Sequence, residues 1–221
     1  MNITRKNTEK INKEYLKILI DTESPIIIDV GCYDGRDSLE LAELFKKPQI
    51  YCFEVDPRSI KLFKELVKKD NRIHLIKKAV SNINRNIIFY QSDSPLRNHP
   101  GASSSIKQPK NVLTIFPDIT YTNIITVESI TLDSWSKENN IKKIDLMWVD
   151  VNGAEKEVIE GGKKILEKTR FLFIEFSNKE LWDGQIDKQV LLNMLPNFKK
   201  LGIYNYLGNY GDILLRNKHY E

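Results

Sequence analysis

The chain has 221 residues, 41% of them hydrophobic, which is enough for one well-buried core but short for two independent domains. Its 34 basic and 30 acidic residues give a formal net charge of +4, too small a surplus to indicate nucleic-acid binding by itself. Two cysteines, Cys32 and Cys52, are too few for a disulfide framework or a zinc cluster, so we expect free thiols in a reducing compartment. Charges throughout residues 1–20 argue against a secretory signal, and no apolar run reaches the roughly 20 residues of a membrane span, so we expect a cytoplasmic protein.

Short apolar segments alternate with amphipathic helical segments, a pattern typical of βαβ units and a largely parallel sheet. The spacing of apolar residues predicts an accessory helix over 8–20 within residues 1–24, followed by a single domain over 25–221. Strands are predicted at 26–30, 50–55, 73–76 with an extension at 79–80, 86–90, 124–127, 144–150 and 171–176. Helices are predicted at 36–45, from Asp56 and Pro57 onward, and at 131–135, 154–166 and 188–195.

The last predicted element is a hairpin with strands at 199–206 and 213–216, which places an antiparallel strand on an otherwise parallel sheet. The predicted fold class is α/β: a Rossmann-like fold with a mostly parallel seven-stranded sheet, an antiparallel last strand and helices on both faces. Residues 91–122 interrupt the pattern with Ser, Pro, Asn and Gly. Because long loops inside a domain are usually binding elements, we expect this loop to cap a substrate site.

The strongest motif is Asp29-Val30-Gly31-Cys32-Tyr33-Asp34-Gly35, between a predicted buried strand and a helix. Gly31 permits a sharp turn off the strand, and Gly35 permits the backbone to approach a ligand at the helix start. The spacing lacks the third glycine that a dinucleotide pyrophosphate requires. The carboxylates of Asp29 and Asp34 favour a ligand with an ammonium and a sulfonium charge, although a turn without a ligand would need the same glycines.

Glu54 ends the second predicted strand, where a carboxylate can accept hydrogen bonds from both ribose hydroxyls of a nucleoside. Asp56, two residues later, is better interpreted as a helix N-cap. In Lys78-Ala79-Val80-Ser81, the residues Ala79 and Val80 are expected to bracket the base of that nucleoside, although packing in the core explains them equally well.

A second strong motif, Asp150-Val151-Asn152-Gly153-Ala154-Glu155, follows the strand next to the switch point where open α/β sheets bind ligands. Asp150 is predicted to project into that crevice and to orient or deprotonate an acceptor. Glu155 either contacts the acceptor or only begins the next helix. Glu175 lies among apolar residues, where burial would raise the pKa of its carboxyl. With Asp150 it could hold a divalent cation, but no third ligand is evident and we predict no metal site.

The long loop carries further candidate residues. His99 could act as a base, although a solvated loop histidine is the better interpretation. Ser103 and Ser104 in the loop, with Asn152 and Glu155 after the later strand, are candidates for binding the acceptor.

In chain order, the sequence resembles the FkbM family of methyltransferases over about residues 25–178. The resemblance rests on Asp-Val-Gly-x-x-x-Gly, Phe-Glu-x-x-Pro, Ser103-Ser104-Ser105, Thr131-Leu132-Asp133, the segment 150–155 and Phe173-Ile174-Glu175. The Thr-Leu-Asp segment followed by Asp-x-x-Gly-Ala-Glu is the most specific part. Many members have Glu, Gln or Asp where this chain has Asn152, so the family pattern assigns that side chain no role.

The resemblance implies a class I methyltransferase fold, S-adenosylmethionine as donor, and O-methylation of a hydroxyl on a sugar, glycan or related small molecule. It maps cofactor binding onto Asp29, Gly31, Asp34, Gly35 and Glu54, with Asp150 between cofactor and acceptor. Residues next to these motifs complete the expected cofactor site: Tyr33, Ser38, Val55, Ala79 and Val80. We expect a small-molecule or glycan acceptor and no nucleic acid, and a homodimer is left open.

Two alternatives to a methyltransferase are considered. An NAD-dependent oxidoreductase would also use Glu54, but the missing third glycine disfavours it. A non-catalytic nucleoside-binding module would not need the acidic residues at the ends of the fourth and fifth parallel strands.

Overall fold

The computed structural model describes residues 9–94 and 101–220. Its main sheet has seven strands, and β10 is antiparallel to both of its neighbours while the other adjacent pairs are parallel. The spatial order is β3 (Ile73–Ile76), β2 (Gln49–Phe53), β1 (Ile26–Val30), β7 (Ile144–Val149), β8 (Thr169–Ser177), β10 (Tyr210–Asn217) and β9 (Phe198–Tyr204). This topology confirms the predicted fold class.

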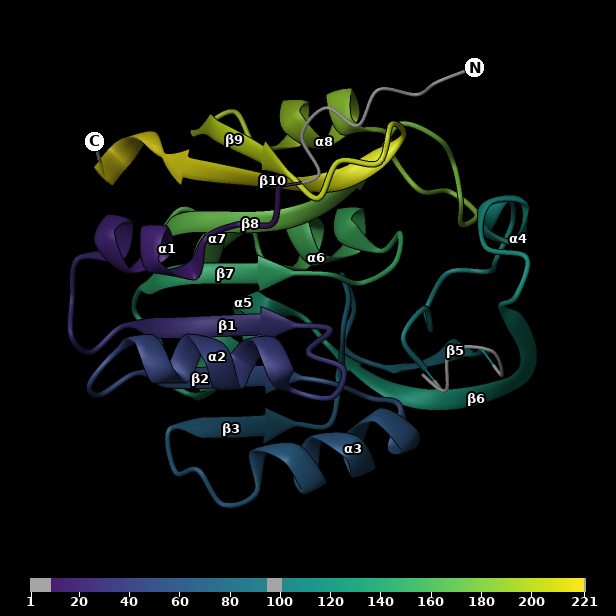
Figure 1. Cartoon of the computed structure of the whole chain (residues 1–221), viewed down its shortest axis with the longest axis horizontal. Coiled ribbons are helices and arrows are strands. Elements are labelled where there is room, and N and C mark those ends of the chain that lie inside the picture. Colours follow the sequence, from purple (N-terminus) through teal and green to yellow (C-terminus); the bar gives the residue numbers. More distant parts are fainter. Residues whose placement is uncertain (1–8, 95–100, 221) are drawn as a thin grey trace.

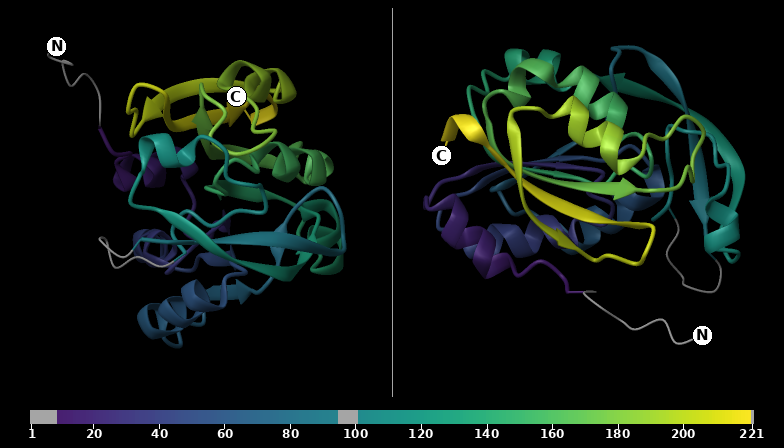
Figure 2. Two further views of the ribbon diagram at one scale, coloured as in Figure 1. Left: turned by 90° about the vertical axis from the view of Figure 1, so that its right-hand side faces the viewer. Right: turned by 90° about the horizontal axis from the view of Figure 1, so that it is seen from above.

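Helices cover both faces of the main sheet (Figure 1; Figure 2, right). One layer contains α1 (Lys13–Ile20), α2 (Arg36–Leu44) and α3 (Pro57–Val67). The other contains α5 (Leu132–Glu138), α6 (Glu155–Gly161), α7 (Lys163–Leu166) and α8 (Lys188–Met194), and a short 3₁₀ helix, Lys218–Tyr220, follows β10. Because side chains alternate along a strand, Leu146 packs toward the first layer and Met147 toward the second, so every residue of β7 is buried.

Three predicted elements differ from the structure. The first helix begins at Lys13, where the Asn12 side chain caps it, rather than at residue 8. Ala79–Val80 does not extend β3 but forms β4, which pairs with β6 in a second sheet. The predicted helix 154–166 is two helices separated at Gly162, because the Asp133 carboxylate accepts the backbone N–H groups of Lys164 and Ile165 and so caps a new helix start.

The second sheet has the order β4 (Ala79–Val80), β6 (Thr120–Ile130) and β5 (Asn86–Asp93). With α4 (Val112–Ile115) it lies beyond the arrowheads of β1, β3 and β7 in Figure 1. We call residues 86–94 and 101–130 the cap. Residues 91–122, expected as one long loop, therefore contain the end of β5, α4 and the start of β6.

The cap is fastened to the segment that follows β8. The carbonyl oxygen of Leu181 accepts the backbone N–H groups of residues 110, 111 and 112 at 3.0, 2.9 and 3.1 Å. Trp182 is buried beside Val112 and lies against Gly153, where a Cβ atom would be 2.9 Å from the Cβ of Trp182. Gly153 thus leaves the space that this tryptophan fills, which connects the cap to the loop after β7.

None of the helices in the described part of the chain combines the length and the apolar character that a membrane span requires.

Candidate active site

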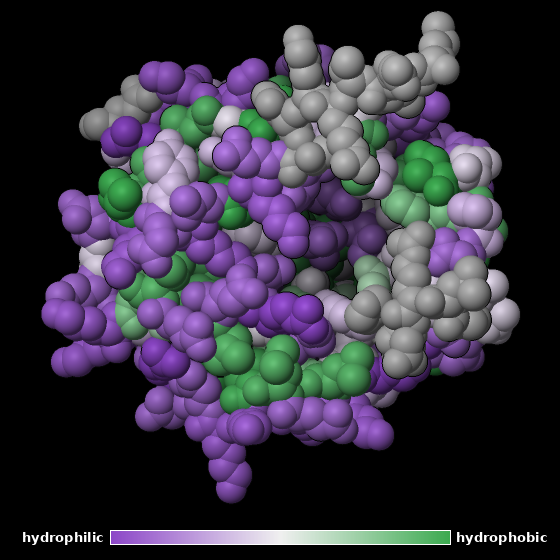
Figure 3. Space-filling model, viewed as in Figure 1, coloured by the Kyte–Doolittle hydropathy of each residue, from purple (hydrophilic) through white to green (hydrophobic). Residues whose placement is uncertain are grey.

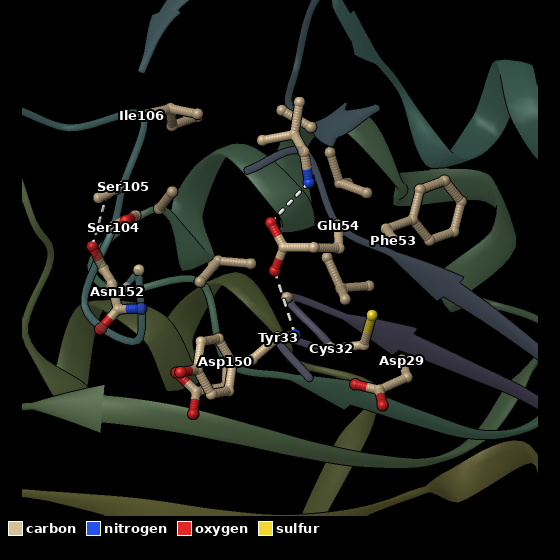
Figure 4. A pocket seen from close by; sticks show the side chains of 18 of the residues that line it. Asp29, Cys32, Tyr33, Phe53, Glu54, Ser104, Ser105, Ile106, Asp150 and Asn152 are labelled. Atoms are coloured by element: carbon tan, nitrogen blue, oxygen red, sulfur yellow. Dashed lines mark hydrogen bonds between the residues drawn. The ribbon is translucent and has the colours of Figure 1, made fainter. Parts of the chain in front are cut away.

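A cavity of about 290 Å³ lies at the carboxyl ends of β1, β2 and β7, with the cap as its opposite wall. Small-molecule sites typically begin at roughly this volume. The hollow near the centre of Figure 3 is bordered by hydrophilic side chains. In Figure 4, Ser104, Ser105 and Ile106 of the cap stand across the cavity from Phe53, Cys32 and Asp29.

Most of the residues predicted from the motifs line this cavity. They are Asp29, Gly31, Tyr33, Asp34, Glu54, Val55, Ala79, Val80, Ser104, Asp150 and Asn152. Of the described residues, Gly35, Ser38, Ser103, Glu155 and Glu175 do not line it. His99 lies outside the described residues.

Gly31 holds the ends of three strands together. Its N–H donates to the carbonyl of Phe53 at 3.0 Å, and the N–H of Asp150 donates to the carbonyl of Val30 at 3.0 Å. The φ of Gly31 is +84°, and a Cβ atom there would lie 1.9 Å from the carbonyl oxygen of Asp150. Only glycine therefore permits the turn after β1 and the end of β7 to meet at this floor of the cavity.

Gly35 has a packing role that the sequence did not indicate. Its φ is +79°, and a Cβ atom would lie 2.5 Å from the ring of Phe63 on α3. The glycine thus lets the start of α2 approach α3, whereas we had expected it to let the backbone approach a ligand. Ser38, one turn into α2, acts through Asp29, since its hydroxyl donates to that carboxylate.

The Glu54 carboxylate is fixed by three backbone N–H groups. One oxygen accepts from Val55 and Asp56 at 2.6 and 2.7 Å, and the other from Tyr33 at 3.1 Å. Burial raises the pKa of Glu54 to about 7, although the three N–H donors favour the ionised form. Asp56 caps α3, as expected, by accepting the N–H of Arg58. Glu54 is therefore the carboxylate of this pair that is presented to the cavity (Figure 4).

Two further ionisable groups lie at the end of β1. Burial raises the pKa of Asp29 to about 7, partly offset by the hydrogen bond from Ser38. Burial also raises the pKa of the Cys32 thiol well above its usual value, so this sulfur faces the cavity as a neutral thiol. Cys32 was not predicted to be a site residue, because a thiol in a turn carries no ligand signature.

The apolar part of the cavity is shared by both sheets. Ala79 and Val80 come from β4, Phe89 from β5 and Ile106 from the cap segment that follows. Ala79 and Phe89 belong to the same small core as the partly buried Val55 and Ile106. These side chains form an apolar wall of the kind that an aromatic base requires. The sequence did not indicate Phe89 and Ile106, because the strand pairing of the second sheet decides which side chains face the cavity.

An acidic cluster continues from Asp150 into the sheet. It contains Asp150, Glu155, Glu175 and Asp212, and the charges of Glu155 and Asp212 raise the pKa values of both Asp150 and Glu175. Asp150 is open to the cavity, yet the surrounding protein, with Asp212 and Glu155, raises its pKa to about 8. Asp212, opposite Glu175 in the antiparallel pair of β10 and β8, was missed because only that register brings it here.

Glu155 and Glu175 have different environments within this cluster. Glu155 is buried, and its carboxylate accepts the N–H of Gly153 at 3.1 Å, which favours the structural interpretation of this residue. The pKa of Glu175 is raised well above its usual range, first by burial and then by Asp150. One of its oxygens has no hydrogen-bond partner among the described residues.

In the described part of the chain, no group of three or more His, Cys, Asp or Glu side chains is arranged to hold a metal ion.

The cap reaches the loop after β7 through Ser105. Its hydroxyl donates to the carbonyl of Asn152 at 2.7 Å, and the Asn152 side chain donates to the carbonyl of Ala102 at 3.4 Å. Asn152 has a φ of +53°, a conformation that asparagine tolerates well. Ser104, by contrast, points its hydroxyl to Asp56, and the Ser103 N–H donates to Ser92.

The donor set of the cavity fits S-adenosylmethionine. Asp29 and Asp150 offer carboxylates to an ammonium and a sulfonium, Glu54 offers acceptors to ribose hydroxyls, and the apolar wall can pack on adenine. Lys78 is the one basic residue among the described residues that line the cavity, and it is paired with Glu128 at 3.2 Å. A pyrophosphate would meet carboxylates here without a free cation beside it.

Comparison with known proteins agrees with this chemistry. The model of the methyltransferase FkbM domain matches residues 29–214. A protein of Sinorhizobium fredii (strain NBRC 101917 / NGR234), 2-O-methyltransferase NoeI, is 38% identical over 210 residues, covering 94% of this chain and 85% of that protein.

Solved structures share the fold at low identity. An rRNA methylase from Streptococcus thermophilus aligns with a TM-score of 0.51 and 13% identity, covering 93% of each chain. Precorrin-6y C5,15-methyltransferase from Geobacter metallireducens GS-15 aligns with a TM-score of 0.52 and 9% identity, covering 93% of this chain and 87% of that chain. These similarities confirm a Rossmann-like class I fold. The family match over residues 29–214 and the relative that is 38% identical show that the chain belongs to the FkbM family of methyltransferases and is an S-adenosylmethionine-dependent enzyme.

Proposed function

We propose that this protein methylates a hydroxyl oxygen of a sugar, a glycan or a related small molecule. The observation that carries the proposal is the acidic cavity shared by the strand ends and the cap, in a chain 38% identical to a 2-O-methyltransferase. When bound, S-adenosylmethionine supplies an electrophilic methyl carbon on a positively charged sulfur. Because that methyl is already reactive, the chain contributes mainly alignment and removal of one proton.

The residues at the ends of β1 and β2 hold the donor in this proposal. Glu54 is oriented by three N–H groups before any ligand binds, so its oxygens are available to ribose hydroxyls at little further ordering cost. Asp29 is the carboxylate for the donor's ammonium. The same acidic lining disfavours NAD, and an oxidoreductase is not proposed.

Asp150 is the first candidate for the base that accepts the acceptor's proton. It is the only member of the acidic cluster among the described residues that line the cavity. Its pKa of about 8 makes its ionised form a competent proton acceptor near neutral pH. Glu175 is second, because it does not line the cavity, although the charge of Asp150 helps to raise its pKa. His99 remains a candidate from sequence alone.

The cap is proposed to bind the acceptor and exclude water. Ser104 and Asn152 line the cavity, and the hydrogen bond between Ser105 and Asn152 fixes how closely the cap approaches Asp150. Ser103 remains a weaker candidate, because it contacts Ser92 and does not line the cavity.

The direct test is methyl transfer with isotope-labelled S-adenosylmethionine to a panel of monosaccharides, oligosaccharides and small polyhydroxyl compounds. We expect mass spectrometry to find one labelled methyl on an oxygen of at least one saccharide. Asp150→Asn should abolish most of the signal, whereas Glu138→Gln, an exposed carboxylate at the end of α5, should leave it unchanged. Transfer only to nitrogen or carbon, or to no member of the panel, would contradict the proposal.

A further inference from the structure

A second concavity lies on the other face of the second sheet. The cavity at the ends of β1, β2 and β7 is called the donor cavity below. Because side chains alternate along β5, Phe89 faces this donor cavity while Ile88 and Tyr90 face away from it. The space on that side is about 510 Å³. We call it the outer groove and define it by the residues used below: Arg85, Asn86, Ile88, Tyr90, Gln108 and Glu157.

The outer groove contains a polar atom whose hydrogen-bonding capacity is unused. Glu157 on α6 pairs with Lys107 through one carboxylate oxygen at 2.8 Å. Its other oxygen is buried and has no partner among the described residues. Since buried carboxylate oxygens are normally hydrogen-bonded, this atom is suited to accept a bond from a ligand.

Further side chains of the outer groove are free to bind. No described residue pairs with the side chains of Arg85, Asn86, Tyr90 or Gln108. The two amides and the phenol each both donate and accept, which matches hydroxyl groups, since these also do both. Ile88, which is 54% exposed, adds an apolar surface beside the half-buried ring of Tyr90.

Most of the charged side chains that line the outer groove are already paired. The Lys107 ammonium pairs with the Glu157 carboxylate. The carboxylate of Asp183, which also lines the groove, lies 3.7 Å from the ammonium of Lys110. Arg85 is the one unpaired cation that the described residues of the groove offer to a phosphorylated polymer. The phosphates of such a polymer would also meet the free carboxylate oxygen of Glu157. A sugar unit presents hydroxyls at its edge and C–H groups on its faces, and both kinds of surface have a counterpart here.

The outer groove adjoins the donor cavity. Ser105 and Tyr90 exchange backbone hydrogen bonds of 2.8 and 3.1 Å, so the cap segment runs along the edge of β5. Ile106, the next residue, lines both spaces. A chain of sugar units would reach the outer groove from the cavity by passing Ile106 at this edge of the second sheet.

We infer that the outer groove is a saccharide-binding subsite, which holds sugar units of an oligosaccharide acceptor beyond the unit that is methylated. This inference rests on the proposed O-methylation of a sugar-type acceptor and extends it to an acceptor of several units. The subsite contributes binding energy at a distance from the reacting hydroxyl, and its loss affects long acceptors and not short ones.

Binding is tested first, with the wild-type protein saturated with S-adenosylhomocysteine on an array of immobilised saccharides from monosaccharides to hexasaccharides. We expect retention on some oligosaccharides, weakened about tenfold by the double variant Arg85→Ala/Gln108→Ala and by Glu157→Gln. Thr126→Ala is the matched control, since Thr126 is exposed, pairs with Ile88 and does not line the groove. All variants should bind S-adenosylhomocysteine as the wild type does. No retention by the wild type, or equal retention by the groove variants, would overturn the inference.

Methyl transfer then separates this inference from the proposed function. If the groove variants raise KM about tenfold for oligosaccharides and leave kcat and the KM for monosaccharides unchanged, both stand. If saccharides are methylated and the wild type and all variants have the same KM, the subsite is refuted and the proposed function stands. If the groove variants weaken saccharide binding but no saccharide hydroxyl is methylated, the subsite stands and the proposed function is refuted.

Discussion

The donor side of the cavity is built from two consecutive strand-to-helix turns, whereas the acceptor side is built from segments that meet only in the folded chain. Tyr33 contacts Glu54, and Gly35 packs on Phe63, over separations of a few tens of residues. Ser105, in contrast, contacts Asn152, and residues 110–112 bind the carbonyl of Leu181. Donor recognition can therefore be encoded in short motifs, while the acceptor wall depends on how distant segments are docked.

The largest effect on stability is expected from a substitution at the point where the donor side meets the acceptor side. In Gly31→Ala the new Cβ would lie 1.9 Å from the Asp150 carbonyl, so the ends of β1 and β7 must separate. We expect a loss of stability of about 3 kcal/mol or more, measured by chemical denaturation. Gly208→Ala is the matched control, since its φ is +81° but nothing lies within 4 Å of the added Cβ. It should cost only the strain of the backbone, about 1 kcal/mol, and equal losses would refute the steric argument.

Asp150→Asn tests whether the residue between the two sides serves the reaction more than the donor. The amide keeps the shape of the side chain but cannot take a proton at neutral pH. We expect kcat to fall about 100-fold while the affinity for S-adenosylhomocysteine, measured by calorimetry, changes only a few-fold. Unchanged turnover would remove Asp150 from the role of base and leave Glu175 and His99 to be tested.

Glu54→Gln tests the donor side alone. The amide retains one oxygen acceptor but places an NH₂ group where backbone N–H groups or ribose hydroxyls now meet a carboxylate oxygen. We expect the affinity for S-adenosylhomocysteine to fall about 20-fold. Glu65→Gln, an exposed carboxylate on α3, should have no effect. Equal affinities of the two variants would count against the ribose assignment.

The raised pKa values also make donor binding depend on pH. Asp29 and Glu54 have pKa values of about 7, so below that pH much of the free protein carries these carboxyls in protonated form. A ligand that offers an ammonium and hydroxyl donors binds the ionised forms, so binding releases protons. We expect each of the two carboxyls to raise the affinity for S-adenosylhomocysteine by up to about tenfold from about pH 6 to 8. Calorimetry in buffers with different ionisation enthalpies measures the proton release, and proton uptake would contradict this assignment.

The smallest effect is expected on the acceptor side. Ser105→Ala removes the hydrogen bond to the Asn152 carbonyl but leaves the backbone pairing of residue 105 with Tyr90. We expect a loss of about 1 kcal/mol, seen as a several-fold higher acceptor KM with donor affinity unchanged. Thr126→Ala, which alters an exposed residue of the cap that does not line the cavity, is the control. A change in donor affinity instead would show that the two sides are not separable.

The parts of the fold and site that sequence could predict are those with local causes. A β-rich apolar run, a glycine turn and an amphipathic helix occur within some twenty residues of β1 and α2, and the structure has them as predicted. The N-cap at Asp56 and the position of Glu54 follow equally from neighbours in the chain. The Thr131-Leu132-Asp133 motif was recognised as specific, but its role in capping α5 and α7 appeared only when Lys164 was placed beside Asp133.

The parts that sequence could not predict have causes at long range. Ala79 and Val80 belong to a second sheet because β6, some fifty residues later, pairs with them. Asp212 joins the acidic cluster only through the register of β10 on β8. Residues 91–122 look like a loop because polar side chains such as Gln91 and Ser92 are buried there, which breaks the alternation of polar and apolar residues, and only the register of β5 on β6 makes the flanking segments part of a sheet.

The position of β7 between β1 and β8 governs how a nascent chain can assemble. Strands β1, β2 and β3 can pair once residue 76 has been synthesised, but the free edge of β1 stays open until residues 144–149 follow. In the interval β5 can pair with β6, in a register that runs from Asp93 with Thr120 to Asn86 with Glu128. A chain that ends after residue 130 would expose the unpaired, apolar edge of β1, which is a template for aggregation and a substrate for chaperones.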